Sequence, residues 1–204
     1  MERSATTAAE FLALLREEPV KPGSIAAWLD RAAPADRVAA IRAAGRGAQR
    51  RLYAAVEGHG TLRLADLVAP SRAPLETVRH FGKNTLPLFT RFEKRFCRPP
   101  GQDAAAPAEL WGYNFQTLQP VTGPGYFTAR EDDPRGEVLI DYTRVPASAP
   151  PGWPAPRRNE AGLSRFVYGF MVDRLRRVSE HVTIGSAARN GRDLGSWFLL
   201  CREA

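Results

Sequence analysis

Two turn sequences in the second half of the chain constrain the fold more than any other feature. Residues 132–136 read Asp-Asp-Pro-Arg-Gly and separate two short apolar runs, and Asn190–Gly191 separates another two. Proline and glycine in this order favour a tight reversal of the chain, and Asn-Gly is a strong signal for a two-residue hairpin turn. The sequence therefore predicts two antiparallel hairpins, at residues 125–145 and 182–202.

The segment between these hairpins has the spacing of an amphipathic helix. From Leu163 to Val178, apolar residues recur at intervals of three and four, which predicts a helix over residues 162–180 with one broad apolar stripe. Its other face carries charged side chains, Asp173 among them. Because such a helix commonly covers a sheet, we expect it to lie across the sheet that contains both hairpins.

The first part of the chain reads as helical. Proline residues divide it into short helices, and the longest of these begins at Pro34 and contains Gly45 and Gly47, which weaken it. The expected organisation is a helical N-terminal region, residues 1–80, packed on an α+β domain, residues 81–204. In that domain the antiparallel sheet is covered by the long amphipathic helix.

Residues 82–100 interleave phenylalanines with positive side chains. In a strand, Phe92, Lys94 and Phe96 would share one face and the neighbouring arginines the other, whereas a helix would gather the phenylalanines on one side. The aromatic content and a nearby proline favour a strand that enters the sheet. Core packing is the simplest role for the phenylalanines, because each contributes roughly 1.5–3 kcal/mol when buried.

The chain is basic, with a formal net charge of +7. A positive surplus raises the expectation of an anionic partner, such as nucleic acid, acidic lipid or a phosphorylated ligand. Only three of the 29 lysine and arginine residues are lysines, so a general preference for arginine explains the charge equally well. Nucleic acid is not the favoured partner, because base stacking would require the phenylalanines of residues 82–100 to be exposed.

The sequence contains no recognisable metal or cofactor motif. Its three histidines and two cysteines are dispersed, with no CxxC, HxH or HExxH spacing, so we expect neither a metal nor a cofactor. Cys97 and Cys201 are expected to be two reduced thiols. No run approaches the roughly 18–20 apolar residues that span a bilayer. We therefore expect a cytoplasmic protein without a transmembrane segment.

The candidate site residues are polar side chains on, or at the ends of, otherwise apolar strands. Asp141 stands out because it interrupts the run Val-Leu-Ile-Asp-Tyr, and a buried carboxylate needs a partner. An ion pair across the sheet is the simpler interpretation, and a polar anchor at the floor of a pocket is the functional one. The same set includes Tyr113, Gln116, Tyr142 and His80.

The leading functional hypothesis is a pocket between sheet and helix that binds a small amphipathic or anionic ligand behind a mouth of arginines. The residues expected to bind this ligand are Arg91, Arg95, Tyr126, Asp141 and His181. One alternative is an enzyme of unassigned reaction that uses the same pocket, with His80 or His181 as general acid–base. Another is a nucleic-acid or protein-interaction module. The sequence leaves the oligomeric state open.

Overall fold

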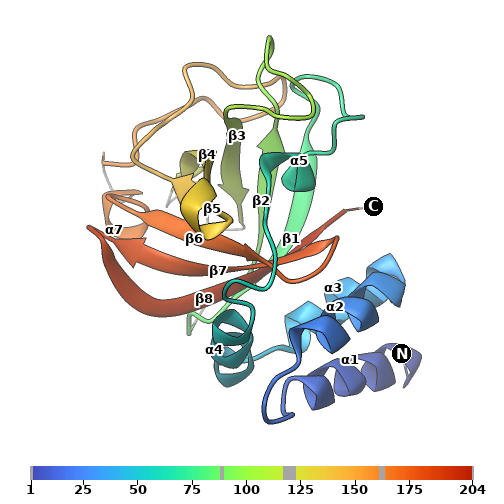
Figure 1. Ribbon diagram of the computed structural model, residues 1–204. Coiled ribbons are helices and arrows are strands. Elements are labelled where there is room, and N and C mark those ends of the chain that lie inside the picture. The colour runs from blue at the N-terminus through green and yellow to red at the C-terminus, as the bar shows by residue number, and fades with distance from the viewer. Residues whose placement is uncertain (1, 88–89, 117–122, 161–163, 204) are drawn as a thin grey trace.

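The centre of the molecule is a closed antiparallel barrel. The computed structural model describes residues 2–87, 90–116, 123–160 and 164–203. Each of eight strands pairs with the next along the chain, and the last strand returns to pair with the first (Figure 1). Closure leaves the sheet without an unpaired edge. The strands are β1 Val78–Asn84, β2 Arg91–Cys97, β3 Leu110–Phe115, β4 Tyr126–Asp132, β5 Glu137–Asp141, β6 Val172–Arg177, β7 Val182–Arg189 and β8 Arg192–Arg202.

The predicted α+β fold, a sheet covered by a long helix over residues 162–180, is wrong. The sheet closes on itself, and the segment holds a single short helix, α7 at Ser164–Val167, followed by strand β6. Residues 162–163 of the predicted helix lie outside the described part of the chain. A barrel buries its apolar face on its own interior, so it needs no covering helix.

The physical reason for this error lies in the sequence from Phe170 onward. Phe170 adopts a positive φ of 61°, which no helix interior tolerates. After it the side chains alternate: Asp173 and Leu175 are fully buried, while Arg174 and Arg176 lie on the outer side and form ion pairs there. An apolar residue every third or fourth position fitted a helix, but the arginines at every second position are typical of a strand.

Both predicted hairpins are present, and each has the expected turn. β4 and β5 are joined by the single 3-10 turn η1, Asp133–Arg135, and by Gly136, whose φ is 63°. β7 and β8 are joined by Asn190 and Gly191, with φ values of 51° and 73°. Positive φ at both central positions is the geometry that Asn-Gly supplies at low steric cost. The prediction of a strand within residues 82–100 is also confirmed, since β2 lies there.

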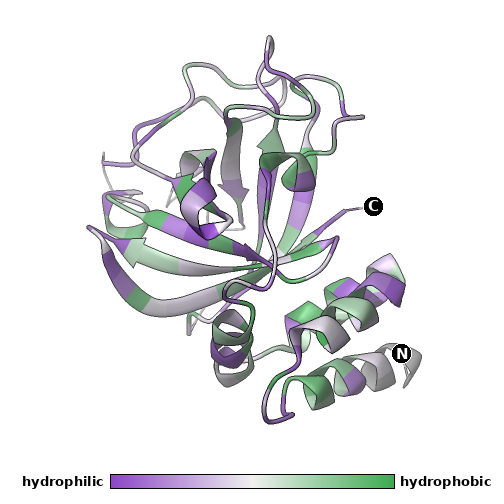
Figure 2. Cartoon of the chain, in the orientation of Figure 1, coloured by the Kyte–Doolittle hydropathy of each residue, from purple (hydrophilic) through white to green (hydrophobic). Residues whose placement is uncertain are grey.

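The barrel interior pairs large rings with glycines. Hydrophobic and hydrophilic residues alternate along the strands (Figure 2), as one inward and one outward face require. Phe127 packs over Gly112, and Phe198 packs over Gly185. A methyl group at either glycine would come within 2.3 Å of the facing ring, so the glycines make room for the phenylalanines.

One end of the barrel is filled by the segment around helix α5, Leu64–Leu67. Leu62, Leu64, Leu67 and Val68 are buried in the same apolar cluster as the barrel interior. The backbone amide of Leu62 donates to the carbonyl of Gly136, which directly precedes β5. We call this segment, with its buried residues Leu62, Leu64, Leu67 and Val68, the plug. It closes the end of the barrel at which β1, β3, β5 and β7 begin.

Four further helices, α1 Glu2–Leu14, α2 Pro22–Arg31, α3 Pro34–Ala43 and α4 Arg46–Ala55, gather on one outer side of the barrel (Figure 1). α3 and α4 contact β8, and α1 packs on α2 and α3. Their apolar residues form a second core with the outward side chains of β7 and β8, including Ile184 and Leu199. The long helix expected from Pro34 is divided in two, because Ala44 and Gly45 leave the helical conformation.

Arg176 fixes α4 to the barrel. From β6 its guanidinium pairs with Glu137 at 2.7 Å and Glu57 at 3.1 Å, and donates to the carbonyl of Tyr53 at 2.8 Å. It also lies 4.0 Å from the centroid of the Tyr53 ring. A planar cation with several donors suits this position, because it meets two carboxylates, a carbonyl and an aromatic face at once.

Candidate functional site

A pocket opens at the other end of the barrel, where β1, β3, β5 and β7 finish. Its volume is about 360 Å³, at the small end of the roughly 300–1,000 Å³ typical of ligand sites. The wall is mostly apolar, and α7 forms part of it; α5 and α7 lie on different sides of the barrel in Figure 1. The apolar and aromatic lining includes Leu86, Phe92, Phe166, Val167, Met171, Leu194, Trp197 and Phe198.

The polar part of the lining gathers around Lys94. Its Nζ donates to the Tyr142 hydroxyl and to Asn114 Oδ1, the latter at 3.1 Å, and lies 3.7 Å from Asp173 Oδ2. The Asn114 amide donates in turn to the Tyr142 hydroxyl at 3.0 Å. All four residues are buried. They come from β2, β3, β6 and the residue directly after β5, so only the closed barrel brings them together. We call these four residues the polar floor.

Burial shifts the pKa values of the two charged groups of the polar floor toward neutrality. Loss of solvation lowers the pKa of Lys94 to about 8, an effect that the charge of Asp173 partly offsets. Loss of solvation likewise raises the pKa of Asp173 to about 6, against the opposing effects of Lys94 and the Tyr142 hydroxyl. The pKa of Tyr142 is raised well above its ordinary value, again chiefly by burial. Near pH 7 the floor therefore holds one ion pair and a neutral phenol.

One oxygen of the polar floor is not satisfied by the protein. Asp173 Oδ1 is buried and accepts no hydrogen bond from any described residue, although the Asp173 side chain is only 4% exposed. A buried carboxylate oxygen without a donor costs free energy, so such groups need an explanation. Asp173 belongs to the pocket lining, and its Oδ1 is buried there without a donor among the described residues.

Aromatic rings surround the Lys94 ammonium group. Its Nζ lies 4.9 Å from the centroids of Phe127 and Tyr142, and 5.0 Å from that of Phe198. Ring faces attract a cation within about 6 Å. They supply part of the stabilisation that water would otherwise give to the buried charge.

The rim of the pocket is apolar and exposed. Phe166 is 74% exposed, and Leu86 and Leu194 are nearly half exposed. Arg189 ties α7 to the barrel, because its Nη2 donates to the carbonyls of Phe166 and Val167 at 2.9 and 3.2 Å. It is the one arginine that lines this pocket within the described residues. Among the described residues, the lining thus lacks the several arginines that were expected at its mouth.

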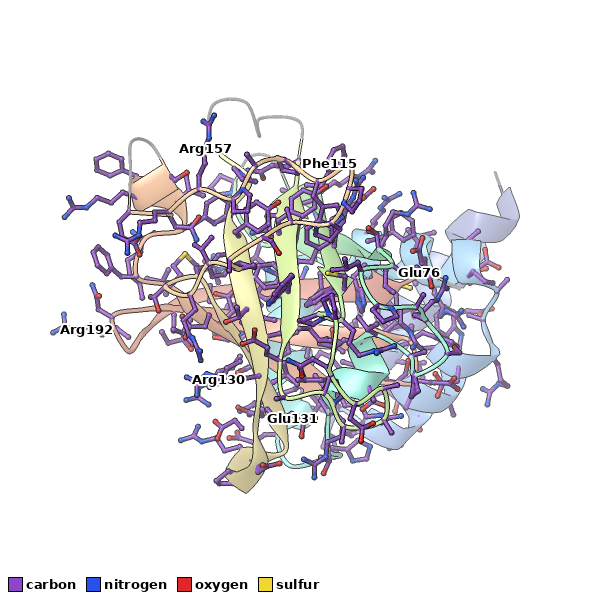
Figure 3. The ribbon with its side chains drawn as sticks, turned by 90° about the horizontal axis from the view of Figure 1, so that it is seen from above. Glu76, Phe115, Arg130, Glu131, Arg157 and Arg192 are labelled. Carbon is purple, nitrogen blue, oxygen red and sulfur yellow. The ribbon has the colours of Figure 1, made fainter. Side chains whose placement is uncertain are left out.

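Two of the five predicted site residues lie on the outer face of β2. Arg91 is exposed at the start of this strand. Arg95 pairs with Glu93 at 2.9 Å, donates to the Tyr113 hydroxyl at 3.1 Å, and stacks 3.9 Å from the ring centroid of Phe115, which lies at the periphery of the molecule (Figure 3). These contacts account for Arg95 as a surface residue of the barrel.

The other three are also held by neighbours outside the pocket. Tyr126 is buried beneath Trp153 and donates to the carbonyl of Pro154. Asp141 accepts from the Thr143 amide and hydroxyl at 2.9 and 2.6 Å. Its nearest cation, at 3.9 Å, is Arg130, which projects outward (Figure 3). His181 lies 3.4 Å from Arg202 on the helical side, and burial lowers its pKa. None of the five predicted residues lines the pocket, and their role in binding stays a prediction.

His80, the other proposed general acid–base, is enclosed in the barrel interior. Its Nε2 lies 3.0 Å from the carbonyl of Leu67 in the plug, and burial lowers its pKa to about 3. The ring is therefore neutral at physiological pH and can donate to that carbonyl. Neither His80 nor His181 lines the pocket.

Sequence reasoning grouped Tyr142 and Gln116 with the polar strand residues but missed Lys94, Asn114 and Asp173 as parts of a site. The signal for Lys94 was its place between Phe92 and Phe96 on one strand face, since a cation on a buried face needs a partner. Asp173 was assigned to the solvent side of a helix, so its pairing with Lys94 was hidden by the wrong secondary structure.

The described residues give no sign of a metal centre, since no group of three His, Cys, Asp or Glu side chains among them could hold an ion. Cys97 and Cys201 are both buried and free. No helix in these same residues is long and apolar enough to cross a membrane. Comparisons with protein-family models, curated proteins and solved structures each found no significant match, so the interpretation of this site depends on its own geometry.

Proposed function

We propose that the barrel binds one small, largely apolar molecule in the pocket, with the polar end of that molecule on the polar floor. The observation that carries this proposal is a mostly apolar cavity whose lining includes a buried carboxylate with one unpaired oxygen, Asp173 Oδ1. Leaving such an oxygen unpaired costs about 1–3 kcal/mol. A ligand that donates a hydrogen bond to Asp173 recovers this free energy and buries its own apolar part as well.

The charges of the floor favour a neutral polar end over an anionic one. With Lys94 and Asp173 both ionised near pH 7, their charges cancel, so the floor offers no net attraction for an anion. A carboxylate on the floor would also be repelled by the negative charge of Asp173. A hydroxyl or amide can donate to Asp173 while it accepts from Lys94. The sequence predicted an amphipathic or an anionic ligand, and these charges favour the amphipathic one.

Thermal unfolding with a matched ligand series tests the proposal. Octan-1-ol, octanamide and octanoate share one chain length and differ in their polar ends. At a concentration of 100 times Kd, a ligand stabilises the folded state by about 2.7 kcal/mol, which raises Tm by roughly 5–10 °C for a chain of this size. We expect the alcohol and the amide to raise Tm and octanoate to raise it less. Equal or absent shifts for all three would contradict the proposal.

Two variants locate the binding. Ala187 is buried and lines the pocket, so Ala187→Leu should fill the cavity and abolish the shift in Tm. Asp141→Asn changes another buried carboxylate that lies outside the pocket and should leave the shift intact. If both variants respond to octan-1-ol like the unmodified protein, the ligand binds elsewhere.

A further inference from the structure

We propose that Lys94 is a nucleophile that forms a Schiff base with an aldehyde or ketone bound in the pocket. This inference depends on the proposed function, since the carbonyl compound must first occupy the cavity. It gives the site a covalent chemistry and restricts the ligand class to apolar carbonyl compounds.

The position of Lys94 meets the first requirement, which is access of its nitrogen to a ligand. Lys94 lines the pocket together with Asp173 and Tyr142, and its Nζ contacts Asn114 and Tyr142, which belong to the same lining. An apolar chain that fills the cavity with its carbonyl group leading would therefore bring the carbonyl carbon to Nζ. This is the positioning that lets a bimolecular reaction proceed as a unimolecular one.

The reaction is balanced without any further reagent. The neutral amine of Lys94 attacks the carbonyl carbon, a proton moves to the carbonyl oxygen, and water leaves as the carbon–nitrogen double bond forms. In sum, a lysine ammonium and an aldehyde give a protonated imine and one water molecule. Asp173 and the Tyr142 hydroxyl lie beside Nζ and can carry the protons that these steps exchange.

The surroundings of Nζ suit the product as well as the free lysine. A protonated imine keeps the positive charge, so Asp173 at 3.7 Å remains its counterion. The ring faces of Phe127 and Phe198, at 4.9 and 5.0 Å, also continue to face a cation. The site therefore needs no rearrangement of charge to hold the covalent adduct.

The identity of the residue is informative in a chain that uses arginine for nearly all its cations. Of the three lysines, Lys21 is exposed beside Glu17 and Lys83 lies on the outer face of β1; Lys94 alone is buried. Arginine could hold the same ion pair, but it does not lose its proton in proteins. With a pKa of about 8, roughly a tenth of Lys94 is neutral at pH 7, about two hundred times the fraction of an ordinary lysine.

Reductive trapping tests the proposal on the full chain. The variant Lys21→Arg/Lys83→Arg keeps Lys94 as its one lysine side chain. We would incubate it at pH 7 with octanal and sodium cyanoborohydride, then measure the intact mass and map the modified peptide. The expected adduct on Lys94 has the mass of octanal less one oxygen atom, and the peptide map separates it from any adduct on the amino-terminal amine. In the unmodified protein, Lys94 should react roughly a hundred times faster than Lys21 or Lys83.

Octan-1-ol separates this inference from the proposed function. It occupies the pocket but cannot form an imine, so it should slow trapping at Lys94 and leave the amino terminus unaffected. A rise in Tm with octan-1-ol but no adduct on Lys94, or an adduct that forms no faster than on Lys21, would overturn the Schiff-base inference alone. No rise in Tm and no adduct would overturn both. Trapping in urea should remove the preference for Lys94.

Discussion

Removal of one member of the Lys94–Asp173 pair should be costly, and the cost should change with pH in opposite directions for the two residues. The charged atoms lie 3.7 Å apart and both side chains are at most 4% exposed. At an effective dielectric constant of about 20, their attraction is roughly 4.5 kcal/mol. We would compare Lys94→Met, Asp173→Asn and the double variant with the unmodified protein.

In each single variant, the loss of unfolding free energy is limited because the remaining charged residue can become neutral. Without Lys94, protonating Asp173 at pH 7 costs about 4.2 kcal/mol, since its ordinary pKa is roughly 3.9. Without Asp173, deprotonating Lys94 costs about 4.6 kcal/mol from an ordinary pKa of roughly 10.4. We therefore expect each single variant to lose about 4 kcal/mol. The double variant leaves no buried charge and should lose far less than the sum.

The sign of the pH dependence follows from which state binds more protons. In the unmodified protein both groups are ionised between their pKa values of about 6 and 8, folded or unfolded, so they add no slope there. In Lys94→Met the folded state binds an extra proton at Asp173, so stability falls by about 1.4 kcal/mol per pH unit as pH rises. In Asp173→Asn the unfolded state binds the extra proton at Lys94, so stability rises equally with pH.

Urea unfolding at pH 6, 7 and 8 measures these slopes. The control is Arg79→Met, which breaks the more exposed pair with Glu203; because water solvates this pair, its loss should leave stability independent of pH over this range. Parallel or flat profiles for Lys94→Met and Asp173→Asn would refute the account of a buried, mutually compensated pair. So would a double variant whose loss equals the sum of the single losses.

Three further predictions concern the scaffold. Gly112→Ala should destabilise the protein by about 1–3 kcal/mol in urea unfolding, because the new methyl group meets the Phe127 ring. Gly47→Ala in α4 is the control: its methyl group meets nothing within 4 Å, so it should stabilise the protein by about 0.5 kcal/mol. Arg176→Met should cost about 3 kcal/mol because it removes the closest cation of buried Glu137, while Arg177→Met, which breaks a partly exposed pair, should cost under about 1 kcal/mol. Deletion of residues 1–33 should lower Tm and solubility, because Phe11, Leu15 and Leu29 belong to the second core; an unchanged Tm would contradict the proposal that the N-terminal helices pack on the rest of the chain.

Local turn chemistry made the two hairpins predictable. Asn190–Gly191 and the Pro-Arg-Gly turn each act over a few residues, so their effect can be read without knowledge of the rest of the chain. Closure of the barrel has no such local signal. The pairing of β1 with β8 joins His80 to Arg202 across most of the chain, and one sequence does not reveal which distant strands meet. The site depends on that closure, so it could not be assembled from the sequence either.

The error over residues 162–180 shows how two periodicities can coexist in one segment. Leu175 and Val178 fit a helical stripe, yet Arg174 and Arg176 fit the outer face of a strand equally well. The apolar spacing predicts a helix, and in that helix Asp173 falls on the charged face opposite the apolar stripe. Its partner Lys94 lies on a strand nearly eighty positions earlier, so the compensation became visible only in three dimensions.

The plug formed by Leu62, Leu64, Leu67 and Val68 fills one end of the barrel, and the pocket opens at the other end. Under the proposed binding mode, a ligand therefore enters and leaves at the end of the barrel where Phe166 is exposed. A ligand that binds with its polar end on the polar floor would leave with its apolar end first. Under the same binding mode, a ligand with a longer tail would extend to the exposed side chains of Leu86 and Leu194, so the proposal implies a limit on chain length.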